Sequence, residues 1–520
     1  MKHILQMKNI TKRFPGVVAN DQISLDVIEG EIHALVGENG SGKSTLMNVL
    51  YGLFHADEGE IYVRGEKTTI DEPRDAINLR IGMVFQHFML VETLTVAENV
   101  ILGSEIRRGV RVDYQQAVAE VQRLAEEYGL NVDPQAKIQD ISVGQQQRVE
   151  ILKALYRGAE LLILDEPTAV LTPQEVEDLI EVMNNLKAQG TSIIFITHKI
   201  KEVLAVSDHV TVLRRGKKIG TKATKDTDER DLAEMMVGRD VLLEVEKTPA
   251  QPKAVVFAAK NLAIKDERGS ERVRGIDLEV RAGEVLGIAG VEGNGQSQLV
   301  EAIAGLMPIH GGTLQLNGRD ISRQTPLERK QSGLGYVPED RHRRGLILDY
   351  SVADNLILGF HGQEPFVRYG FIRSDRAIQD YAVKLVESYD VRPPEPQYKA
   401  ASLSGGNQQK VVVAREFTRT PSFLICAQPT RGVDIGAIEF IHKQIIAQRD
   451  QGAAVLLVSA ELDEILSLSD RIAVMYNGEI VTTMPAEEAT EKKLGFLMLG
   501  GQPEDYSDAN EGGVLDEVES

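Results

Sequence analysis

The chain has 520 residues, of which 42% are hydrophobic and 26% are charged, values close to those of ordinary globular proteins. Disordered and collagen-like classes are therefore excluded. A formal net charge of −20 disfavours broad binding to nucleic acid, because it repels a phosphate backbone.

Segments that direct a chain into or across a membrane are not expected. The first residues form no apolar stretch of the kind that a secretory signal needs, and no apolar run approaches the ~20 residues of a transmembrane helix. The single cysteine, Cys426, excludes an internal disulfide and is typical of a reducing compartment. Residues 502–520 are rich in Asp, Glu, Gly and Ser, which predicts a solvated acidic tail.

A phosphate-binding loop follows the first predicted core strand. The apolar strand Ile32–Val36 leads into GENGSGKS, and a helix is predicted over residues 45–51. The glycines of such a loop let backbone N–H groups wrap phosphates, Lys43 reaches the terminal phosphates and the Ser44 hydroxyl ligates Mg²⁺. The flanking strand and helix disfavour the alternative of a simple glycine-rich turn. The candidate nucleotide-binding residues here are Gly37, Glu38, Asn39, Gly40, Ser41, Gly42, Lys43, Ser44 and Thr45.

Two carboxylates follow a later strand. Residues 98–129 have a helical pattern rich in Ala, Glu and Arg, which predicts a separate helical subdomain. The apolar strand over 161–164 then ends in Asp165 and Glu166; Asp165 can hold Mg²⁺ through water, and Glu166 can polarise the attacking water. Gln86 and His198 are candidates for the groups that touch the metal, the water and the γ-phosphate, although single residues of these types at strand ends are more often structural.

The chain repeats itself. GENGSGKS recurs as GVEGNGQS, and GMVFQ recurs as GYVPE, both 253 positions later. ISVGQQQ recurs as LSGGNQQ and LDEPT as CAQPT, both 262 positions later, and this order indicates a duplication. Each unit alternates β-branched strands with helical stretches, which predicts an α/β fold with a largely parallel sheet. We expect domains at 1–243 and 254–500, a linker at 244–253 and an acidic flexible tail at 501–520.

From about residue 4 to 495 the motifs resemble those of ATP-binding-cassette (ABC) ATPases, which are P-loop NTPases. The resemblance implies two tandem cassettes, each with a RecA-like core, a β subdomain and an inserted α-helical subdomain. Gln86 would lie in the loop towards the helical subdomain and the membrane partner, His198 would be the switch histidine, and Phe14 would stack on adenine. A core or surface role is the alternative for Phe14. The implied cofactors are ATP and Mg²⁺, with Ser44, Gln86 and Asp165 directed towards the metal.

Members of this family pair head to tail, so that the signature segment of each cassette completes the phosphate loop of the other. In the second half, Ser404, Gly405 and Gly406 of the signature LSGGN, together with Asp434, would face the first loop. In the first half, Val143 and Thr172 stand at the positions of Gly405 and Asp434 and would face the second loop. All the strong elements would therefore meet at one composite site.

The second half lacks the reactive groups of the first. Loss of a general base alone costs ~10²–10⁴ in rate, so no useful turnover is expected there. The glycines of its loop and Ser297 leave loose nucleotide binding open, although Glu339 adds negative charge near any phosphate. The counterparts of Lys43, Gln86, Asp165, Glu166 and His198 are Gln296, Glu339, Ala427, Gln428 and Ala460, and no aromatic residue matches Phe14.

Within the family, LSGGNQQK and PTRGVD are similar to the ATPases of simple-sugar importers such as that for ribose. The segments GQS, AQPTRG and AIEFIHK look more like the nucleoside-importer branch, which works with a substrate-binding lipoprotein. The resemblance implies a peripheral subunit on the cytoplasmic face of the inner membrane, below two integral permease subunits that dock beside Gln86 and Glu339. Import of ribose or galactose, a soluble tandem ATPase acting on ribosomes or nucleic acid, and a non-hydrolysing scaffold remain as alternatives.

Overall fold

The computed structural model describes residues 2–15, 17–86, 88–109, 111–168, 171, 173–238, 247–266, 268–291 and 293–506. The chain divides into two compact units, Met1–Val241 and Leu242–Ser520. The predicted domain boundary at residue 243 lies outside the described residues, and so does the predicted tail beyond residue 506.

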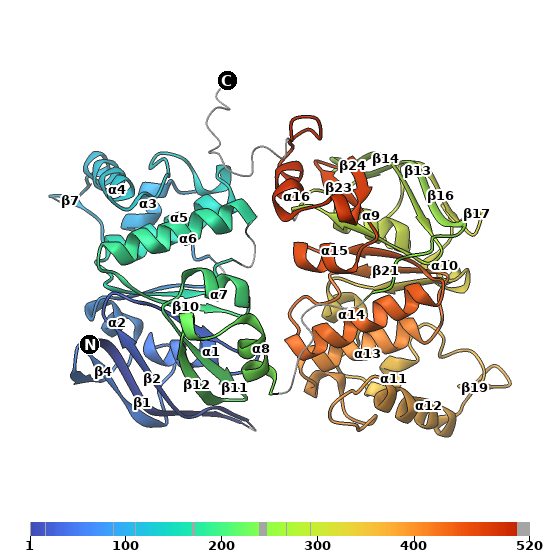
Figure 1. Ribbon diagram of the computed structural model, residues 1–520, viewed down its shortest axis with the longest axis horizontal. Helices are drawn as coiled ribbons and strands as arrows, with labels where there is room; N and C mark the ends of the chain where they lie inside the picture. The colour runs from blue at the N-terminus through green and yellow to red at the C-terminus, as the bar shows by residue number, and fades with distance from the viewer. Residues whose placement is uncertain are drawn as a thin grey trace. The chain divides into compact units, whose positions relative to one another are not determined.

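The first unit contains a six-stranded sheet, a four-stranded antiparallel sheet and a set of helices (Figure 1). Its strands are β1 His3–Phe14, β2 Val17–Ile28, β3 Ile32–Val36, β4 Glu58–Val63, β5 Glu66–Thr68, β6 Ile81–Val84, β7 Arg107–Arg108, β8 Arg111–Val112, β9 Leu161–Asp165, β10 Ser192–Thr197, β11 His209–Arg214 and β12 Lys217–Ala223. Its helices are α1 Lys43–Leu50, α2 Pro73–Asn78, α3 Val96–Ile101, α4 Tyr114–Tyr128, α5 Val143–Tyr156, α6 Pro173–Ala188, α7 Ile200–Val206 and α8 Glu229–Val237, with 3₁₀ turns η1 Ile138–Asp140 and η2 Thr224–Asp226.

The six-stranded sheet positions the phosphate loop. Its order is β12-β11-β3-β10-β9-β6, and every pair except β11–β12 is parallel. All residues of β3, β9 and β10 are buried, as expected for a parallel sheet covered on both faces. Because neighbouring parallel strands end at the same edge, the residues that follow β3, β9 and β10 meet there.

The other two parts of the first unit lie at opposite ends of it (Figure 1). The antiparallel sheet has the order β2-β1-β4-β5, and its apolar face packs with α1 in one core that includes Leu5, Leu25 and Leu46. Helices α3, α4 and α5 contact one another and form the helical subdomain. The Thr95 side chain caps α3, and Gly129 ends α4 in the left-handed conformation.

The second unit has the same architecture. Its six-stranded sheet has the order β18-β21-β22-β15-β23-β24 and its antiparallel sheet the order β14-β13-β16-β17, which match the first unit strand for strand. Its strands are β13 Val255–Lys265, β14 Glu271–Arg281, β15 Glu284–Ala289, β16 Gly311–Leu316, β17 Arg319–Asp320, β18 Leu334–Val337, β19 Val367–Arg368, β20 Ile372–Arg373, β21 Phe423–Ala427, β22 Ala454–Val458, β23 Arg471–Tyr476 and β24 Glu479–Pro485. Its helices are α9 Gln296–Ala304, α10 Pro326–Gln331, α11 Val352–Leu356, α12 Asp375–Ser388, α13 Gly405–Phe417, α14 Ile435–Asp450, α15 Leu462–Leu468 and α16 Glu491–Met498, with a π-helical turn η3 Arg341–Gly345 and 3₁₀ turns η4 Ala400–Ser402 and η5 Ala486–Glu488. The predicted duplicated α/β fold is therefore confirmed.

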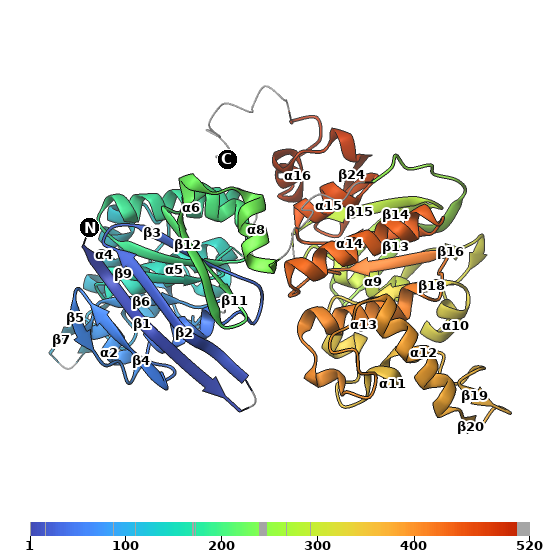
Figure 2. The ribbon, with the colours of Figure 1, turned by 60° about the horizontal axis from the view of Figure 1, so that its bottom comes forward.

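The halves differ in length within residues 339–404, where the repeat offset changes. This segment contains η3 and the hairpin β19–β20, which projects beyond α12 (Figure 2). The side chains of Tyr369 and Phe371 at its tip are exposed.

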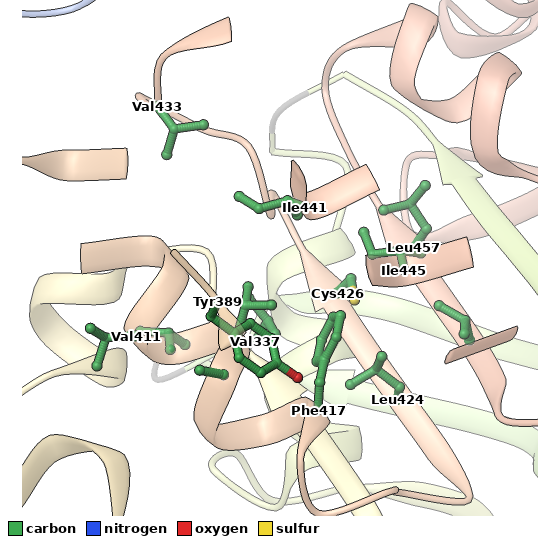
Figure 3. Packing of buried hydrophobic residues seen from close by; sticks show 14 of the residues in the cluster. Val337, Tyr389, Val411, Phe417, Leu424, Cys426, Val433, Ile441, Ile445 and Leu457 are labelled. Atoms are coloured by element: carbon green, nitrogen blue, oxygen red, sulfur yellow. The ribbon is translucent and has the colours of Figure 1, made fainter. Parts of the chain in front are cut away.

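Cys426 lies in the core of the second unit. Its side chain packs close to Phe417, Leu424 and Ile445 (Figure 3). Complete burial raises the pKa of the Cys426 thiol well above its ordinary value, so the thiol stays protonated and acts as a small apolar side chain.

The described part of the predicted linker is held by the second unit. Lys247 Nζ donates to the carbonyl of Ser469 at 2.6 Å, and the buried Arg449 donates to the carbonyl of Thr248 at 2.9 Å. A segment that breaks both periodicities in sequence is thus fixed at residues 247 and 248 by hydrogen bonds between side-chain donors and backbone carbonyls.

Candidate functional site

The phosphate loop runs from the end of β3 to the start of α1. Gly40 and Gly42 both have a left-handed backbone, with φ of 78° and 100°. A Cβ at Gly42 would lie 2.3 Å from the carbonyl oxygen of Ala19, and the Asn20 amide donates to the carbonyl of Gly42 at 2.9 Å. Only glycine fits there, so β2 holds the loop in shape from outside.

Lys43 lies inside this loop. Its ammonium donates to the carbonyls of Gly37 at 2.7 Å and Glu38 at 3.1 Å, and the residue is only 5% exposed. Burial lowers the pKa of Lys43, while the negative charges of Glu166 and Asp165 oppose that shift. A desolvated cation enclosed by backbone dipoles is suited to binding an anionic phosphate.

Asp165 and Ser44 lie together below the loop. Asp165 ends β9, is 7% exposed and accepts a hydrogen bond from the Ser44 hydroxyl at 3.3 Å. Burial raises the pKa of Asp165, and the neighbouring Glu166 raises it further, whereas Ser44 and Lys43 lower it. A hydroxyl beside a desolvated carboxylate fits a hard cation such as Mg²⁺, which prefers oxygen ligands and would compensate the buried charge.

Glu166 is held from two sides. Gln86 Nε2 donates to one carboxylate oxygen at 3.2 Å, and His198 Nδ1 lies 3.2 Å from the other. Since a carboxylate only accepts, Nδ1 must carry the proton in this contact. The hydrogen bond from His198 lowers the pKa of Glu166 although burial opposes it, so the carboxylate is ionised at neutral pH and can accept a proton.

The backbone conformation also sets the direction of the Glu166 side chain. Its φ is 48°, a left-handed conformation that is strained for a residue with a side chain, and its N–H donates to the carbonyl of Ile196 at 2.9 Å. The structure therefore brings together Lys43, Ser44, Gln86, Asp165, Glu166 and His198 at one edge of the sheet, as the sequence predicts.

The other candidate residues of the first unit lie in the phosphate loop, in α1 and at the end of β1. Asn39 and Gly40 are exposed at the loop tip, Ser41 is buried, and Thr45 is half-buried in the first turn of α1. Phe14 lies at the end of β1, with its ring edge-on to Phe54 at 5.3 Å between centroids. Its predicted stacking on adenine stays a prediction.

The signature residues of the second unit form a helix start. Ser404 precedes α13, and its hydroxyl accepts hydrogen bonds from the backbone and side-chain nitrogens of Asn407 at 3.5 and 2.9 Å. Gly405 leads into the buried Gly406, and a Cβ on Gly406 would lie 2.6 Å from the Asp434 carboxylate. Asp434 in turn caps α14 by accepting from the N–H of Ala437 at 2.8 Å.

In the first unit, Ser142 caps α5 in the same way and Val143 is exposed. Thr172, the predicted counterpart of Asp434, lies outside the described residues.

The second phosphate loop keeps its shape but not its chemistry. Gln296 occupies the place of Lys43, and its amide donates to the carbonyl of Val291 at 3.1 Å. Gln428 repeats the left-handed backbone of Glu166, with φ of 46°, but its side-chain oxygen accepts the N–H of Ala460 at 3.1 Å. An amide in that place cannot act as a base.

Two residues near this loop were missed by the sequence analysis. Arg431 NH1 donates to Glu339 at 2.5 Å, and Arg341 donates to the carbonyls of Arg431 at 2.8 Å and Gly432 at 3.4 Å. Arg431 stands where the first unit has Ala169, so the repeat alignment could have revealed it. Arg341 lies in the stretch of unequal length and had no such signal.

A groove in the first unit lies beside the segment that carries Gln86. It has a volume of about 260 Å³ and is lined by apolar and charged side chains, including Phe85, Met89, Glu150 and Lys153. Met89 is 65% exposed at this groove. Among the described residues, no helix is both long and apolar enough to cross a bilayer.

Comparison with known proteins agrees with this geometry. The ABC transporter family matches residues 20–169 and 273–431, one segment in each half. Over 498 residues the chain is 53% identical to the nucleoside import ATP-binding protein NupA of Lactococcus lactis subsp. cremoris, covering 96% of this chain and 98% of that protein. It is 52% identical over 510 residues to the guanosine import ATP-binding protein NupO of Bacillus subtilis, covering 98% and 100%.

A third relative differs in the solute it is named for. The chain is 48% identical over 532 residues to the glucose import ATP-binding protein TsgD13 of Haloferax volcanii, covering 96% of each. All three likenesses extend over nearly the whole of both units. The predictions of a tandem cassette and of an ATP-binding transporter ATPase are thereby confirmed, and the chain belongs to the ABC transporter family.

Proposed function

We propose that this chain is the ATP-hydrolysing subunit of an ABC importer for nucleosides. The likeness to NupA and NupO, at 53% and 52% identity over almost the full length, carries the choice of solute. Import of a simple sugar is the second candidate, since TsgD13 is 48% identical. No residue of this chain is expected to contact the solute, which passes through other subunits.

Hydrolysis in this proposal takes place at the first phosphate loop. Backbone N–H groups and the Lys43 ammonium bind the β- and γ-phosphates, and the ionised Glu166 accepts a proton from the attacking water. Gln86 and His198 hold the Glu166 carboxylate in line with that water. Mg²⁺, held by Ser44, Asp165 and Gln86, would neutralise charge on the phosphates when bound.

The site is completed by the other half of the chain in this proposal. Ser404, Gly405, Gly406 and Asp434 supply a hydroxyl and backbone N–H groups at the start of α13, a position where anions are stabilised. The chain then acts as a head-to-tail pair within one polypeptide, with one competent site. The second phosphate loop, with Gln296 and Gln428, contributes no hydrolysis.

The partners follow from this role. Two integral permease subunits would place cytoplasmic helices beside Gln86, where the 260 Å³ groove offers apolar and charged contacts, and beside Glu339 in the second unit. An extracytoplasmic substrate-binding lipoprotein would deliver the solute. The chain would work at the cytoplasmic face of the inner membrane and would not bind nucleic acid.

Reconstitution tests the proposal. The chain is purified with the permeases that accompany it, placed in proteoliposomes, and its ATPase rate is measured with the receptor loaded with guanosine, glucose or ribose. Stimulation by guanosine and uptake of radiolabelled guanosine support the nucleoside assignment. Stimulation by a sugar alone establishes the second candidate, and co-purification with ribosomes instead of permeases would contradict both.

A further inference from the structure

The second unit contains a pocket of about 620 Å³ around its altered phosphate loop. The loop itself is preserved, because Gly293 and Gly295 have φ of 97° and 106°, close to Gly40 and Gly42 in the first unit. Its neutral Gln296 makes the same kind of contact to the loop carbonyl that Lys43 makes in the first unit. Phosphate-binding geometry thus persists where the lysine charge has been lost.

The residues of this pocket do not fit Mg²⁺. In the first unit the serine hydroxyl is bonded to Asp165, but the counterpart of that carboxylate is the buried Ala427. Ser297 Oγ instead donates to Glu339 Oε2 at 2.8 Å, and the other oxygen of Glu339 accepts from Arg431 at 2.5 Å. Of the counterparts of the proposed metal ligands Ser44, Asp165 and Gln86, one hydroxyl and one carboxylate remain, and a guanidinium already neutralises that carboxylate.

A second arginine, Arg341, fixes the backbone of Arg431 in this position. Its carbonyl accepts a hydrogen bond from Arg341 NH1 at 2.8 Å, and the next carbonyl, that of Gly432, accepts from NH2. Both arginines line the pocket. Glu339 therefore joins a fixed guanidinium to the serine that, in a metal-dependent loop, would ligate the cation.

The arginines that line the described part of the pocket outnumber its carboxylates, which favours binding of an anion. Its described lining contains four arginines and three carboxylates. Arg344 pairs with Glu301 at 3.2 Å, and Asp340 accepts the backbone N–H groups that begin η3. Arg343 forms no ion pair within the described part of the chain, so the pocket offers positive charge to a ligand. Glu339, which the sequence alone suggests would repel phosphate, is neutralised by Arg431.

We propose that this pocket binds the phosphates of a nucleoside triphosphate without a divalent cation, with the Arg431 guanidinium in the place of the metal. The bound nucleotide is not hydrolysed, because Gln428 offers no base. The pocket therefore retains nucleotide while the first site turns over. The inference rests on the proposed function only in taking the second loop as a nucleotide site.

Binding without metal tests this proposal. The full chain with Lys43→Ala, which removes the first loop's ammonium, is dialysed against radiolabelled ATP in excess EDTA and, separately, in Mg²⁺. We expect one equivalent of ATP bound in both conditions, with dissociation constants within about threefold of each other, because no metal contact contributes. Binding that requires Mg²⁺, or no binding in either buffer, would overturn the proposal.

A second variant isolates the guanidinium. Adding Arg431→Ala should weaken ATP binding in EDTA by about 10- to 100-fold, the usual effect of losing a hydrogen bond to a charged group. Arg431→Lys keeps the charge and should retain most of the affinity. Arg376→Ala, which removes an exposed arginine paired with Asp380 at 3.9 Å outside the pocket lining, is the matched control and should change nothing.

The two proposals fail in different ways. If the unaltered chain hydrolyses ATP normally while the Lys43→Ala chain binds none in EDTA, the metal-free pocket is wrong and the proposed function stands. If Arg431→Ala binds as tightly as its parent, the pocket binds nucleotide by its backbone alone and the role of the guanidinium is refuted. Melting curves of each variant establish that it is folded.

Discussion

The most direct test of the one-site arrangement replaces Glu166 with glutamine. The amide has the same size, so the left-handed backbone at this position and the packing around it are preserved. One oxygen remains to accept a hydrogen bond from His198 Nδ1 or Gln86 Nε2, both now 3.2 Å away. What is lost is the negative charge, and with it the proton acceptor.

The size of the effect follows from that loss. General-base catalysis contributes about 10²–10⁴ in rate, which corresponds to roughly 2.7–5.5 kcal/mol at about 1.36 kcal/mol per tenfold. Glu166→Gln should therefore lower steady-state phosphate release by this factor, while ATP binding measured in the same samples changes little. The lowered pKa of Glu166 means that the wild-type carboxylate is fully ionised at neutral pH, so the whole effect is visible there.

The chain provides its own control. Gln428 occupies the equivalent backbone position in the second unit, with φ of 46°, and Gln428→Glu restores a carboxylate there. We expect no gain in turnover, because Gln296 and Ala427 leave the second loop without lysine and metal ligand. Turnover above a tenth of wild type in Glu166→Gln, or new activity in the Glu166→Gln/Gln428→Glu double variant, would refute the one-site reasoning.

Three further predictions follow from single contacts. Lys43→Ala should abolish measurable phosphate release, because it removes the ammonium that contacts the carbonyls of Gly37 and Glu38 inside the loop. Ser404→Ala and Ser142→Ala both remove a helix cap and should each lower stability by about 0.5–2 kcal/mol, but only Ser404→Ala should lower turnover if it completes the first site. Burial raises the pKa of Glu31, yet hydrogen bonds from His33, Ile28 and His209 outweigh it and lower the pKa overall. Such a carboxylate stabilises the fold above its unfolded pKa of about 4.3 and loses that contribution as the pH falls through the folded value. Glu31→Gln should thus reduce the free energy of unfolding by roughly 1.5–3 kcal/mol at pH 7, and urea titrations at pH 7 and below pH 4 should show the difference disappearing in acid.

The sequence predicted the parts of the site that follow from chain order. A strand followed by a glycine-rich loop, and a second strand that ends in two acids, define the sheet edge where Lys43, Asp165 and Glu166 meet. The order of the repeated blocks added Gln86 and His198 as groups that touch the metal, the water and the γ-phosphate; their contacts with Glu166 were not predicted and come from the structure.

Pairing between side chains was not predictable in the same way. Glu339 reads as a charge that repels phosphate, and only the folded chain shows that Arg431 neutralises it. The two residues are far apart in sequence, and several arginines of the second half could have met Glu339 equally well. The choice is made by η3, whose Arg341 fixes the Arg431 backbone. Likewise, nothing in the composition of residues 247–253 indicates that Arg449 would hold that segment.

The repeat suggests that the signature glycines serve the composite ATP site, but their local packing gives a different explanation. A Cβ on Gly406 would lie 2.6 Å from an Asp434 carboxylate oxygen, and one on Gly144 in the first unit would lie 2.4 Å from a Glu175 carboxylate oxygen, so a side chain at either position would displace that carboxylate. A Cβ on Gly405 would lie 2.8 Å from the terminal NH2 of Arg341, which lines the second pocket, and 3.0 Å from the carbonyl oxygen of Gly432. Gly405 of the fuller signature thus lies against the Arg341 side chain of that pocket. The case for a single competent site therefore depends on Lys43, Asp165 and Glu166. The contribution of the signature depends on the Ser404 hydroxyl. The paired variants Ser404→Ala and Ser142→Ala separate the effect of this hydroxyl on turnover from its structural role as a helix cap.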